Sequence, residues 1–431
     1  MPGTLGAAED VRSSVEPAGP SPQAARRTIP AAPVGPVQGP RPAARRIARL
    51  HTFLDRTQAF GPALLVAVML ALLIGPGLML YRGNPTGFIR FGREWVTETH
   101  PPAGAVIDTP TGYDGQYFWA LAQDPLLLAK RTVASFKDAG FRLQRIAYPA
   151  LAYALAAGRT AALPWTLLAI NLAVVIAITM AFAAYARRRG WSGWWALGVG
   201  LLPGLQFATM GDMSDALAVA CMLGGLMAWE RRRRWTAAGL LAVAALAREP
   251  MLLAVAALAI DAGARWWSCR REPGALRRAV AAAWPALALP TVLFLGWQAY
   301  VHVRHGTGTS APGTAFQAPL VGLADEFGRS LRGTATISSS WDLAYLAAIV
   351  AGIGVAFAHV RRGITAPGVA ALLFGLILLV LTFGNDWSYT RLSAPLFAAL
   401  LLAGLERRMR PALAVCTSVA VLGALVPFVI A

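Results

Sequence analysis

Residues Gly61–Leu80, GPALLVAVMLALLIGPGLML, decide the fold of this chain. The stretch carries no charged side chain, and as a helix it would be about 30 Å long, the thickness of a bilayer's hydrocarbon core. Comparable apolar runs recur at 163–186, 194–207, 214–229, 281–300, 343–358, 366–383, 392–405 and 411–430. Each of these runs is therefore predicted to be a membrane-spanning helix.

The composition supports the same conclusion. Of the 431 residues, 56% are hydrophobic and 14% are charged, whereas a soluble domain carries about 25% charged residues. Two further apolar segments do not fit a simple span. Residues 146–157 would make a helix of only about 18 Å and are predicted to be a partial span. Residues 235–264 are interrupted by Arg248-Glu249-Pro250, and because proline removes a backbone donor we predict two short helices that meet at a break. The predicted fold class is an all-α polytopic membrane protein, a bundle of about 10–12 transmembrane or partial spans.

The distribution of arginine predicts the orientation of the bundle. The net charge is +18, but the basic residues do not form the compact basic domain that nucleic-acid binding requires. They recur in short clusters between apolar runs, at 187–189, 231–234, 270–278, 361–362 and 407–410. This is the pattern of cytoplasmic loops, so the N-terminus is predicted to be cytoplasmic. Residues 1–58 are predicted to be a disordered basic tail and residues 59–431 the transmembrane domain.

This orientation places two polar loops, 82–145 and 301–340, on the outer side of the membrane. The second is rich in Gly, Ser and Thr and is predicted to be a mobile cover. The first contains GYDGQYFWALAQDP at 112–125 and FRLQRIAYP at 141–149. Residues 116–129 are predicted to lie along the membrane interface, with Tyr117, Phe118 and Trp119 at the level of the headgroups.

Asp114 is the leading candidate for a catalytic residue. It lies between Gly112 and Gly115, which allow the backbone to bend and a substrate to approach closely. A carboxylate held there suits a general base or a ligand for a divalent cation, Mg²⁺ or Mn²⁺. The alternative is that Asp114 caps the helix that begins near Gln116.

Arg142 and Arg145 are the leading candidates for binding a phosphate. Their spacing of three residues would place both guanidinium groups on one face of a helix. Guanidinium binds phosphate through two parallel hydrogen bonds. The alternative is that both side chains extend to lipid headgroups.

The break at Arg248 and Glu249 places two ionisable groups at membrane depth, which predicts a functional site. Glu249 is expected to pair with Arg248, or Arg248 to face a phosphate; a buried structural ion pair is the alternative. Asp212 and Asp215 are predicted to lie in a solvated outer turn; the alternative is that they contribute carboxylates to the same outer face as the site. Arg391, in the polar stretch 385–391, is a second candidate for binding phosphate.

Other chemistry has little support in the sequence. Three cysteines and five histidines show no metal-ligand spacing, and no glycine-rich phosphate loop is present.

The order of these features resembles the GT-C superfamily of membrane glycosyltransferases. YDGQYFWALAQDP followed by RLQRIAYPALAYAL is similar to bacterial membrane proteins distantly related to PIG-V-type mannosyltransferases and protein O-mannosyltransferases. The resemblance covers about residues 60–265. It differs from the family pattern in the outer loop, where Asp114 is followed by Gly115 and many members have two adjacent acidic residues.

The resemblance implies transfer of a sugar, such as mannose, from a polyprenyl-phosphate donor to an acceptor at the outer face of a bacterial inner membrane. Asp114 would be the base, and Arg142, Arg145 or Arg248 would stabilise the departing phosphate. Tyr113 and Gln116 would bind sugar hydroxyls, and Tyr148, Glu249 and Arg391 complete the predicted substrate-binding set. Donor and membrane lipids are the expected partners. A transporter or flippase of a lipid-linked or anionic solute is the alternative, since such proteins also use broken helices. A third possibility is a non-catalytic relative that only binds lipid.

Overall fold

The computed structural model describes Asp55 and residues 57–129, 139–306, 316–332, 337–383 and 388–430. The chain divides into two units, Met1–His51 and Thr52–Ala431. The first unit, and with it nearly all of the predicted tail, lies outside the described residues. The long helices of the second unit are α2 (Gly61–Leu80), α9 (Leu163–Arg188), α12 (Asp215–Glu230), α13 (Arg234–Ala247), α14 (Leu252–Ser268), α15 (Ala275–His305), α17 (Ile337–Arg361), α18 (Ala366–Leu378), α19 (Ser388–Arg407) and α20 (Arg410–Ile430).

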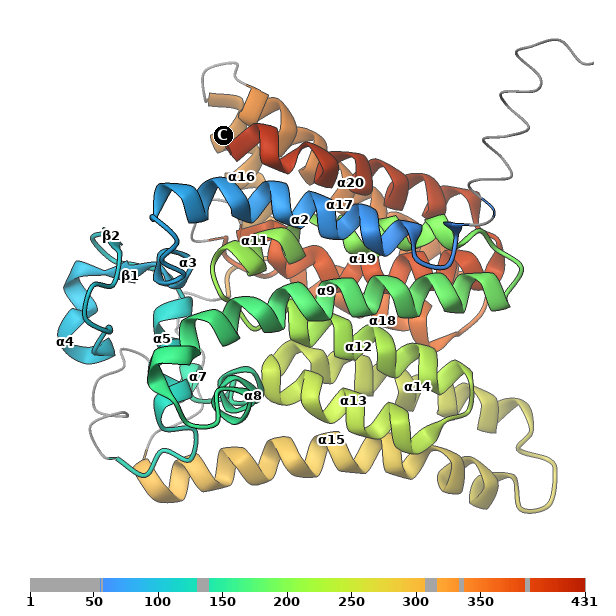
Figure 1. The fold of residues 1–431 in the computed structure, drawn as a ribbon. Helices are drawn as coiled ribbons and strands as arrows, with labels where there is room; N and C mark the ends of the chain where they lie inside the picture. Colours follow the sequence, from blue (N-terminus) through green and yellow to red (C-terminus); the bar gives the residue numbers. More distant parts are fainter. Residues whose placement is uncertain are drawn as a thin grey trace, which may run out of the picture. The chain divides into compact units, whose positions relative to one another are not determined.

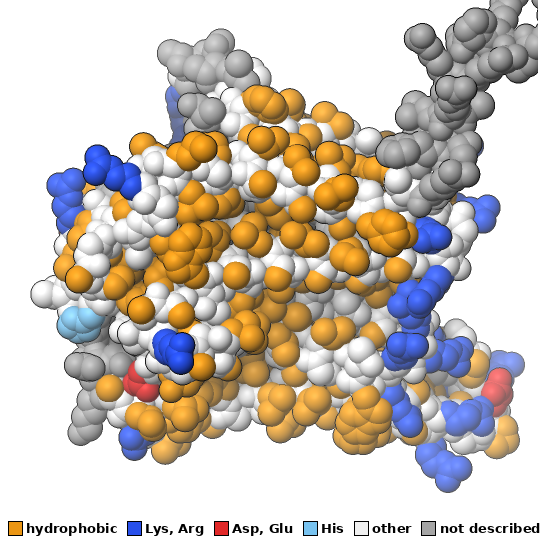
Figure 2. All heavy atoms as spheres, in the orientation of Figure 1, with side chains coloured by type: hydrophobic (Ala, Val, Ile, Leu, Met, Phe, Trp, Pro, Cys, Tyr) orange, Lys and Arg blue, Asp and Glu red, His pale blue; other side chains and the backbone are white. Residues whose placement is uncertain are grey.

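Seven helices in the described part are long and apolar enough to cross a membrane. They are Gly61–Leu80, Thr160–Arg188, Glu249–Ser268, Ala275–His305, Ser338–Arg361, Ser388–Arg407 and Arg410–Val429. Figure 1 shows the long helices lying side by side, and Figure 2 shows the hydrophobic surface that they present across the middle of the same view. The prediction of an all-α, multi-pass membrane protein is confirmed at this level.

The predicted span 194–207 is wrong as a single helix. The structure has η3 (Gly193–Ala196), α10 (Leu197–Gly200) and α11 (Pro203–Met210) in its place. Leu202 is extended, with ψ 121°, because the ring of Pro203 disfavours a helical conformation in the residue before it. The helix is therefore interrupted inside an apolar run, and no charged residue in the sequence marks the interruption.

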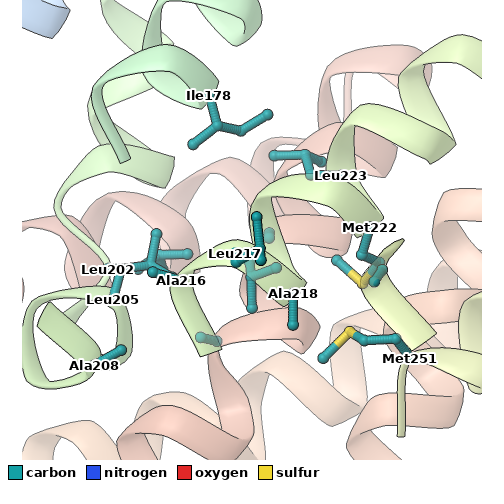
Figure 3. Packing of buried hydrophobic residues seen from close by; sticks show 14 of the residues in the cluster. Ile178, Leu202, Leu205, Ala208, Ala216, Leu217, Ala218, Met222, Leu223 and Met251 are labelled. Atoms are coloured by element: carbon teal, nitrogen blue, oxygen red, sulfur yellow. The ribbon is translucent and has the colours of Figure 1, made fainter. Parts of the chain in front are cut away.

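The predicted break at Arg248 is confirmed, but of the two helices only the first is short, since Glu249–Ser268 is long and apolar enough to cross a membrane. α13 ends at Ala247, Arg248 is extended (φ −152°, ψ 126°), and η4 (Glu249–Met251) leads into α14. Figure 3 shows some of the buried side chains that surround this region: those of α9, α11 and α12 pack together, and Met251, just after the break, belongs to the same cluster. The break is thus embedded in protein, where irregular backbone is tolerated at membrane depth.

The segment 82–162, which begins with the first predicted outer loop (82–145), is folded into short elements. α3 (Thr86–Ile89), β1 (Phe91–Gly92), η1 (Arg93–Trp95), α4 (Val96–Thr99), β2 (Ile107–Thr109), α5 (Gly115–Gln123), α7 (Ala139–Arg142), α8 (Ala147–Leu155) and η2 (Thr160–Ala162) follow in order. β1 and β2 pair in parallel. The prediction of an interfacial helix with Tyr117, Phe118 and Trp119 at the headgroups is wrong, because these side chains are only 5%, 3% and 2% exposed. Every residue of α5 from Gly115 to Ala122 is buried, so the helix is packed within the protein.

The short apolar segment 146–157 forms α8, a helix of nine residues. Figure 1 shows α8 nearly end-on while the long helices run across the view, so α8 lies across the bundle and does not run along it as a partial span would. Leu151, Tyr153 and Leu155 are exposed. α8, and not α5, therefore presents apolar side chains on the outside of the protein.

The second outer loop is shorter than predicted. α15 continues to His305, α16 (Val321–Arg332) is amphipathic, and α17 begins at Ile337. Residues 307–315 and 333–336 lie outside the described part. Backbone hydrogen bonds from Gln317 to Val380 and from Leu320 to Leu379 fix α16 against the end of α18.

The arginine clusters gather at one end of the bundle (Figure 2). Arg189 and Arg231 both lie over the ring of Tyr185, at 5.1 and 4.9 Å from its centroid. Arg408 lies 5.8 Å from the Trp191 ring centroid, which adds the α19–α20 turn to the same end. The opposite end of the long helices carries the folded outer loop.

Candidate functional site

Asp114 precedes α5 but does not cap it with its side chain. The capping prediction is therefore wrong. The Oδ1 atom instead accepts a hydrogen bond from Nη1 of Arg142 at 3.0 Å. The carboxylate is partly exposed, at 27%, so it can be reached from outside.

Two glycines place Asp114. Gly112 has a φ of +69°, a left-handed conformation that glycine adopts without strain. A Cβ atom on Gly115 would lie 2.5 Å from the carbonyl oxygen of Gly211 and 2.6 Å from that of Ile89. The chain can therefore bring residue 114 against the α11–α12 turn only because residue 115 has no side chain.

Three guanidinium groups surround the Asp114 carboxylate. Besides Arg142, an Nη1 atom of Arg391 lies 3.6 Å from Oδ2 and an Nη1 atom of Arg145 lies 3.9 Å from it. Burial would raise the pKa of Asp114, but the positive charges of Arg391, Arg142 and Arg145 outweigh burial and lower that pKa well below its usual range. The predicted pair Arg142 and Arg145 thus meets at one carboxylate, although α7 ends at Arg142 and only the first of the two is helical.

Glu249 pairs with Arg145 and not, as expected, with Arg248. The Nε and Nη2 atoms of Arg145 donate to the two carboxylate oxygens at 3.0 and 2.9 Å, a bidentate pair. The pKa of the Arg145 guanidinium is raised: burial would lower it, but Glu249 and Asp114 favour the charged form. The break after α13 turns consecutive side chains in different directions, and Arg248 pairs with Asp215.

Asp212 and Asp215 are buried, at 0% and 3% exposed, so the prediction of a solvated turn is wrong. Asp215 begins α12 and accepts from Arg248, and Arg391 lies 3.6 Å from its Oδ2 atom. Asp215 therefore belongs to the site, in agreement with the alternative prediction and not with the solvated turn. The sequence feature that indicates Asp215 is its position at the start of an apolar run. A carboxylate buried there without a partner would cost free energy.

These charged groups form one end of a cavity of about 550 Å³. Arg145, Arg248, Arg391, Asp215 and Glu249 line it together with Gln144. The other lining residues are Phe141, Val219, Pro250, Met251, Leu252, Leu253, Ala256, Phe316, Phe374, Ile377, Leu381, Leu392 and Pro395. The cavity is thus amphipathic, with guanidinium groups at one end and a larger apolar surface from α14, α18 and α19.

Some predicted site residues lie beside this cavity and do not line it. Asp114 contacts two lining residues, Arg145 and Arg391, and the Tyr113 ring centroid lies 5.1 Å from Arg391. Gln116 is 1% exposed, accepts from the Gly92 backbone N–H and donates to the Thr111 carbonyl. Tyr148 is fully buried and donates to the Leu167 carbonyl. These contacts hold the loop and α8 in place, and they provide no support for substrate binding by Gln116 or Tyr148.

The site does not fit a divalent cation at Asp114. Hard cations are bound by several oxygen ligands, whereas the nearest charged neighbours of this carboxylate are Arg142, Arg145 and Arg391. Within the described residues, no three or more His, Cys, Asp or Glu side chains are grouped so that they could hold a metal. Of the predicted polar stretch 385–391, residues 385–387 lie outside the described part, and Arg391 is buried on α19.

Comparison with models of protein families gave no match. Comparisons with curated proteins and with solved structures gave none either. The resemblance to GT-C glycosyltransferases therefore stays a prediction, and the function has to be argued from the chemistry of the site.

Proposed function

We propose that this protein is a membrane glycosyltransferase that moves a sugar from a polyprenyl-phosphate donor to an acceptor at the outer face of a bacterial inner membrane. The observation that carries this proposal is the amphipathic cavity, whose guanidinium end touches the partly exposed carboxylate of Asp114. A polyprenyl-phosphate sugar has the matching parts: an apolar chain, an anionic phosphate and a sugar next to it.

In this proposal, Arg145, Arg248 and Arg391 hold the phosphate of the donor. All three line the cavity and are less than a tenth exposed. Guanidinium groups in a site shielded from water stabilise an anionic leaving group strongly, because they are already oriented before the charge develops. The first units of the lipid chain would lie against the apolar lining from α14 and α18, such as Leu253, Phe374 and Ile377.

The reaction would be a displacement at the anomeric carbon. An acceptor hydroxyl oxygen forms the new bond to that carbon, and the bond from carbon to phosphate oxygen breaks. Both electrons of the broken bond leave with the phosphate, and Asp114 takes the hydroxyl proton. No separate acid is required, since the phosphate departs as an anion.

The arginines around Asp114 make it a weak base in the free protein, because they lower the pKa of its carboxyl group. A bound phosphate would compete with Asp114 for Arg145 and Arg391. As these contacts weaken, the pKa of Asp114 rises towards its usual range and the carboxylate becomes a better proton acceptor. Donor binding would in this way activate the base.

The experiment is an assay of the purified protein with a panel of polyprenyl-phosphate sugars, with and without Mg²⁺ or Mn²⁺, scored for release of polyprenyl phosphate. We expect release with one donor, and loss of that release in Asp114→Asn. Glu94→Gln is the matched control, since Glu94 is an exposed carboxylate of the same outer loop. Activity of Asp114→Asn equal to that of the wild type would remove the assignment.

A second candidate, a transporter or flippase of a lipid-linked anion, is favoured by one observation. The helix break at Arg248, Glu249 and Pro250 lines the cavity, and broken helices surround substrate sites in transporters. Movement of the lipid between leaflets of reconstituted vesicles without release of polyprenyl phosphate would support this candidate over the transferase.

A further inference from the structure

A second cavity lies between α14 and α15 and shares no lining residue with the candidate site. It is a groove of about 470 Å³. Its lining is apolar apart from one threonine: Ala262, Gly263, Trp266, Leu276, Ala279, Val280, Ala283, Trp284, Leu287, Ala288, Thr291 and Val292. Small residues leave the space, and the exposed Leu276, Val280 and Trp284 border it on the outside of the bundle. In a chain predicted to span a membrane, an apolar surface of this kind would face the acyl chains of the bilayer.

One end of the groove adjoins an arginine-rich turn. Leu276 of the groove is followed directly by Arg277, and the preceding turn between α14 and α15 carries Arg271; both arginines are exposed. The neighbouring Arg278 is paired with Glu272 at 2.7 Å. Among the described residues, Arg271 and Arg277 have no carboxylate within ion-pair distance, so two positive charges next to the groove are uncompensated. Figure 2 shows basic side chains gathered at this end.

We propose that the groove binds an anionic glycerophospholipid from the leaflet on the arginine-rich side. One acyl chain lies between α14 and α15, and the headgroup phosphate lies on Arg271 and Arg277. An apolar groove between transmembrane helices that ends in a basic cluster has the chemistry of an anionic-lipid site. A second protein helix fits less well, because the basic end would require acidic partners and apolar contact alone gives little driving force between helices in lipid.

The position of α14 connects this lipid with the rest of the molecule. α14 begins directly after the break at Arg248, and its first turn contributes Leu252, Leu253 and Ala256 to the candidate site. Its later turns contribute Ala262, Gly263 and Trp266 to the groove. A bound acyl chain would fill the space between α14 and α15 and so hold α14 in place.

The experiment is native mass spectrometry of the purified full-length chain, titrated with phosphatidylglycerol or with phosphatidylcholine of the same acyl chains. Gly263→Leu tests the groove, because an added Cβ atom at Gly263 meets no atom within 4 Å and the larger side chain fills the space. Gly296→Leu is the matched control, since Gly296 is equally open but lies on α15 outside the groove. Arg271→Gln with Arg277→Gln tests the headgroup contact. Its control is Arg361→Gln with Arg362→Gln, two exposed arginines of another turn.

We expect the wild type to retain phosphatidylglycerol more strongly than phosphatidylcholine. Affinity for phosphatidylglycerol should fall about fivefold for each arginine removed, and both lipids should be lost in Gly263→Leu. Equal retention of the two lipids by the wild type, or unchanged retention in Gly263→Leu, would overturn the proposal. A wild-type dimer that becomes monomeric in Gly263→Leu would also overturn it, because a second copy would then occupy the groove.

Discussion

Arg142 and Arg145 lie three positions apart in the chain and make different contacts with the carboxylates of the site. Arg145 is 5% exposed and forms a two-point contact with Glu249, while Arg142 is 21% exposed, donates a 3.0 Å hydrogen bond to Asp114 and lies 3.5 Å from the Tyr117 ring centroid. A planar fork is required for the two-point contact of Arg145. A lysine ammonium is a point charge, so it reproduces the hydrogen bond of Arg142 to Asp114 but neither the fork nor the stacking on Tyr117.

The first prediction follows from this difference. In Arg145→Lys, one of the two charge-assisted hydrogen bonds to Glu249 is lost, which corresponds to about 1.5–3 kcal/mol. Release of polyprenyl phosphate should therefore fall about tenfold or more in kcat/KM. Arg142→Lys is the matched variant and should lose less activity than Arg145→Lys, because it keeps a positive charge beside Asp114 and loses only the stacking on Tyr117. Equal losses in the two variants would show that charge alone, and not the fork, matters at residue 145.

A second prediction concerns Asp212, which is fully buried and whose two carboxylate oxygens have no hydrogen-bond partner in the described structure. Burial raises the pKa of Asp212 well above its ordinary value of 3.8. The folded protein thus favours the protonated form, and this contribution to stability is complete below the unfolded pKa and is lost as pH rises through the folded pKa. The loss is at most about 1.4 kcal/mol per pH unit.

Asp212→Asn should remove this dependence, since an amide has nearly the shape of the carboxyl group and does not ionise. Thermal melting in detergent at acidic and at alkaline pH measures it. The wild type should lose more stability than the variant as pH rises, and parallel curves would contradict a raised pKa at residue 212.

The sequence indicates which charged residues belong to the site, but it does not indicate which of them pair with one another. Asp114, Arg145, Arg248 and Glu249 stand out because charge is rare in an apolar chain. Spacing along the chain indicated Arg248 as the partner of Glu249, whereas the structure brings Arg145 from 104 residues away. Contacts between distant segments depend on helix packing, which a single sequence does not report.

At the scale of elements, long apolar runs were predicted closely and short ones poorly. α2 has the predicted bounds, because 20 uncharged residues have few alternatives in a bilayer. α5 and α8 were misread because both are nine-residue segments composed mainly of aromatic and small or apolar residues. Which of two such helices is buried depends on what packs over it, and β1, α4 and α8 all lie against α5.

A third prediction tests the close approach that positions Asp114. Gly115→Ala places a methyl group within 2.6 Å of two backbone carbonyl oxygens, those of Gly211 and Ile89, and neither can move without shifting its loop. We expect loss of activity and a lower melting temperature in detergent. Gly75→Ala is the control, since a Cβ atom there meets nothing within 4 Å and alanine is favoured over glycine in a helix by about 0.5–1 kcal/mol. A Gly115→Ala protein with wild-type activity would show that the loop is not held by this contact.

The whole molecule has its basic end and its candidate site at opposite ends of the long helices. If the arginine-rich end is cytoplasmic, as the charge pattern predicts, the site opens outward. Cys269 offers a natural probe, because it is exposed, free and located in the turn between α14 and α15 at the basic end. Cys221 and Cys416 are less accessible.

The fourth prediction is that a membrane-impermeant maleimide will leave Cys269 unlabelled in intact spheroplasts and label it once the membrane is permeabilised. Ala103→Cys in a Cys269→Ser background is the complementary variant, since Ala103 is exposed in the outer loop. That protein should be labelled in intact spheroplasts. The reverse pattern in the two proteins would invert the topology and place the site in the cytoplasm.

The charged cluster at the site is unbalanced: four arginines face three carboxylates within the described residues. The members are Arg142, Arg145, Arg248 and Arg391 with Asp114, Asp215 and Glu249. The surplus positive charge would draw an anionic headgroup towards the cavity before any contact forms, and so raise the rate of encounter. At an ionic strength of 0.1 M such attraction fades over about 10 Å. Added salt would therefore slow donor capture, while turnover of donor already bound stays the same. The surplus charge would thus raise the rate of donor capture when the substrate is scarce.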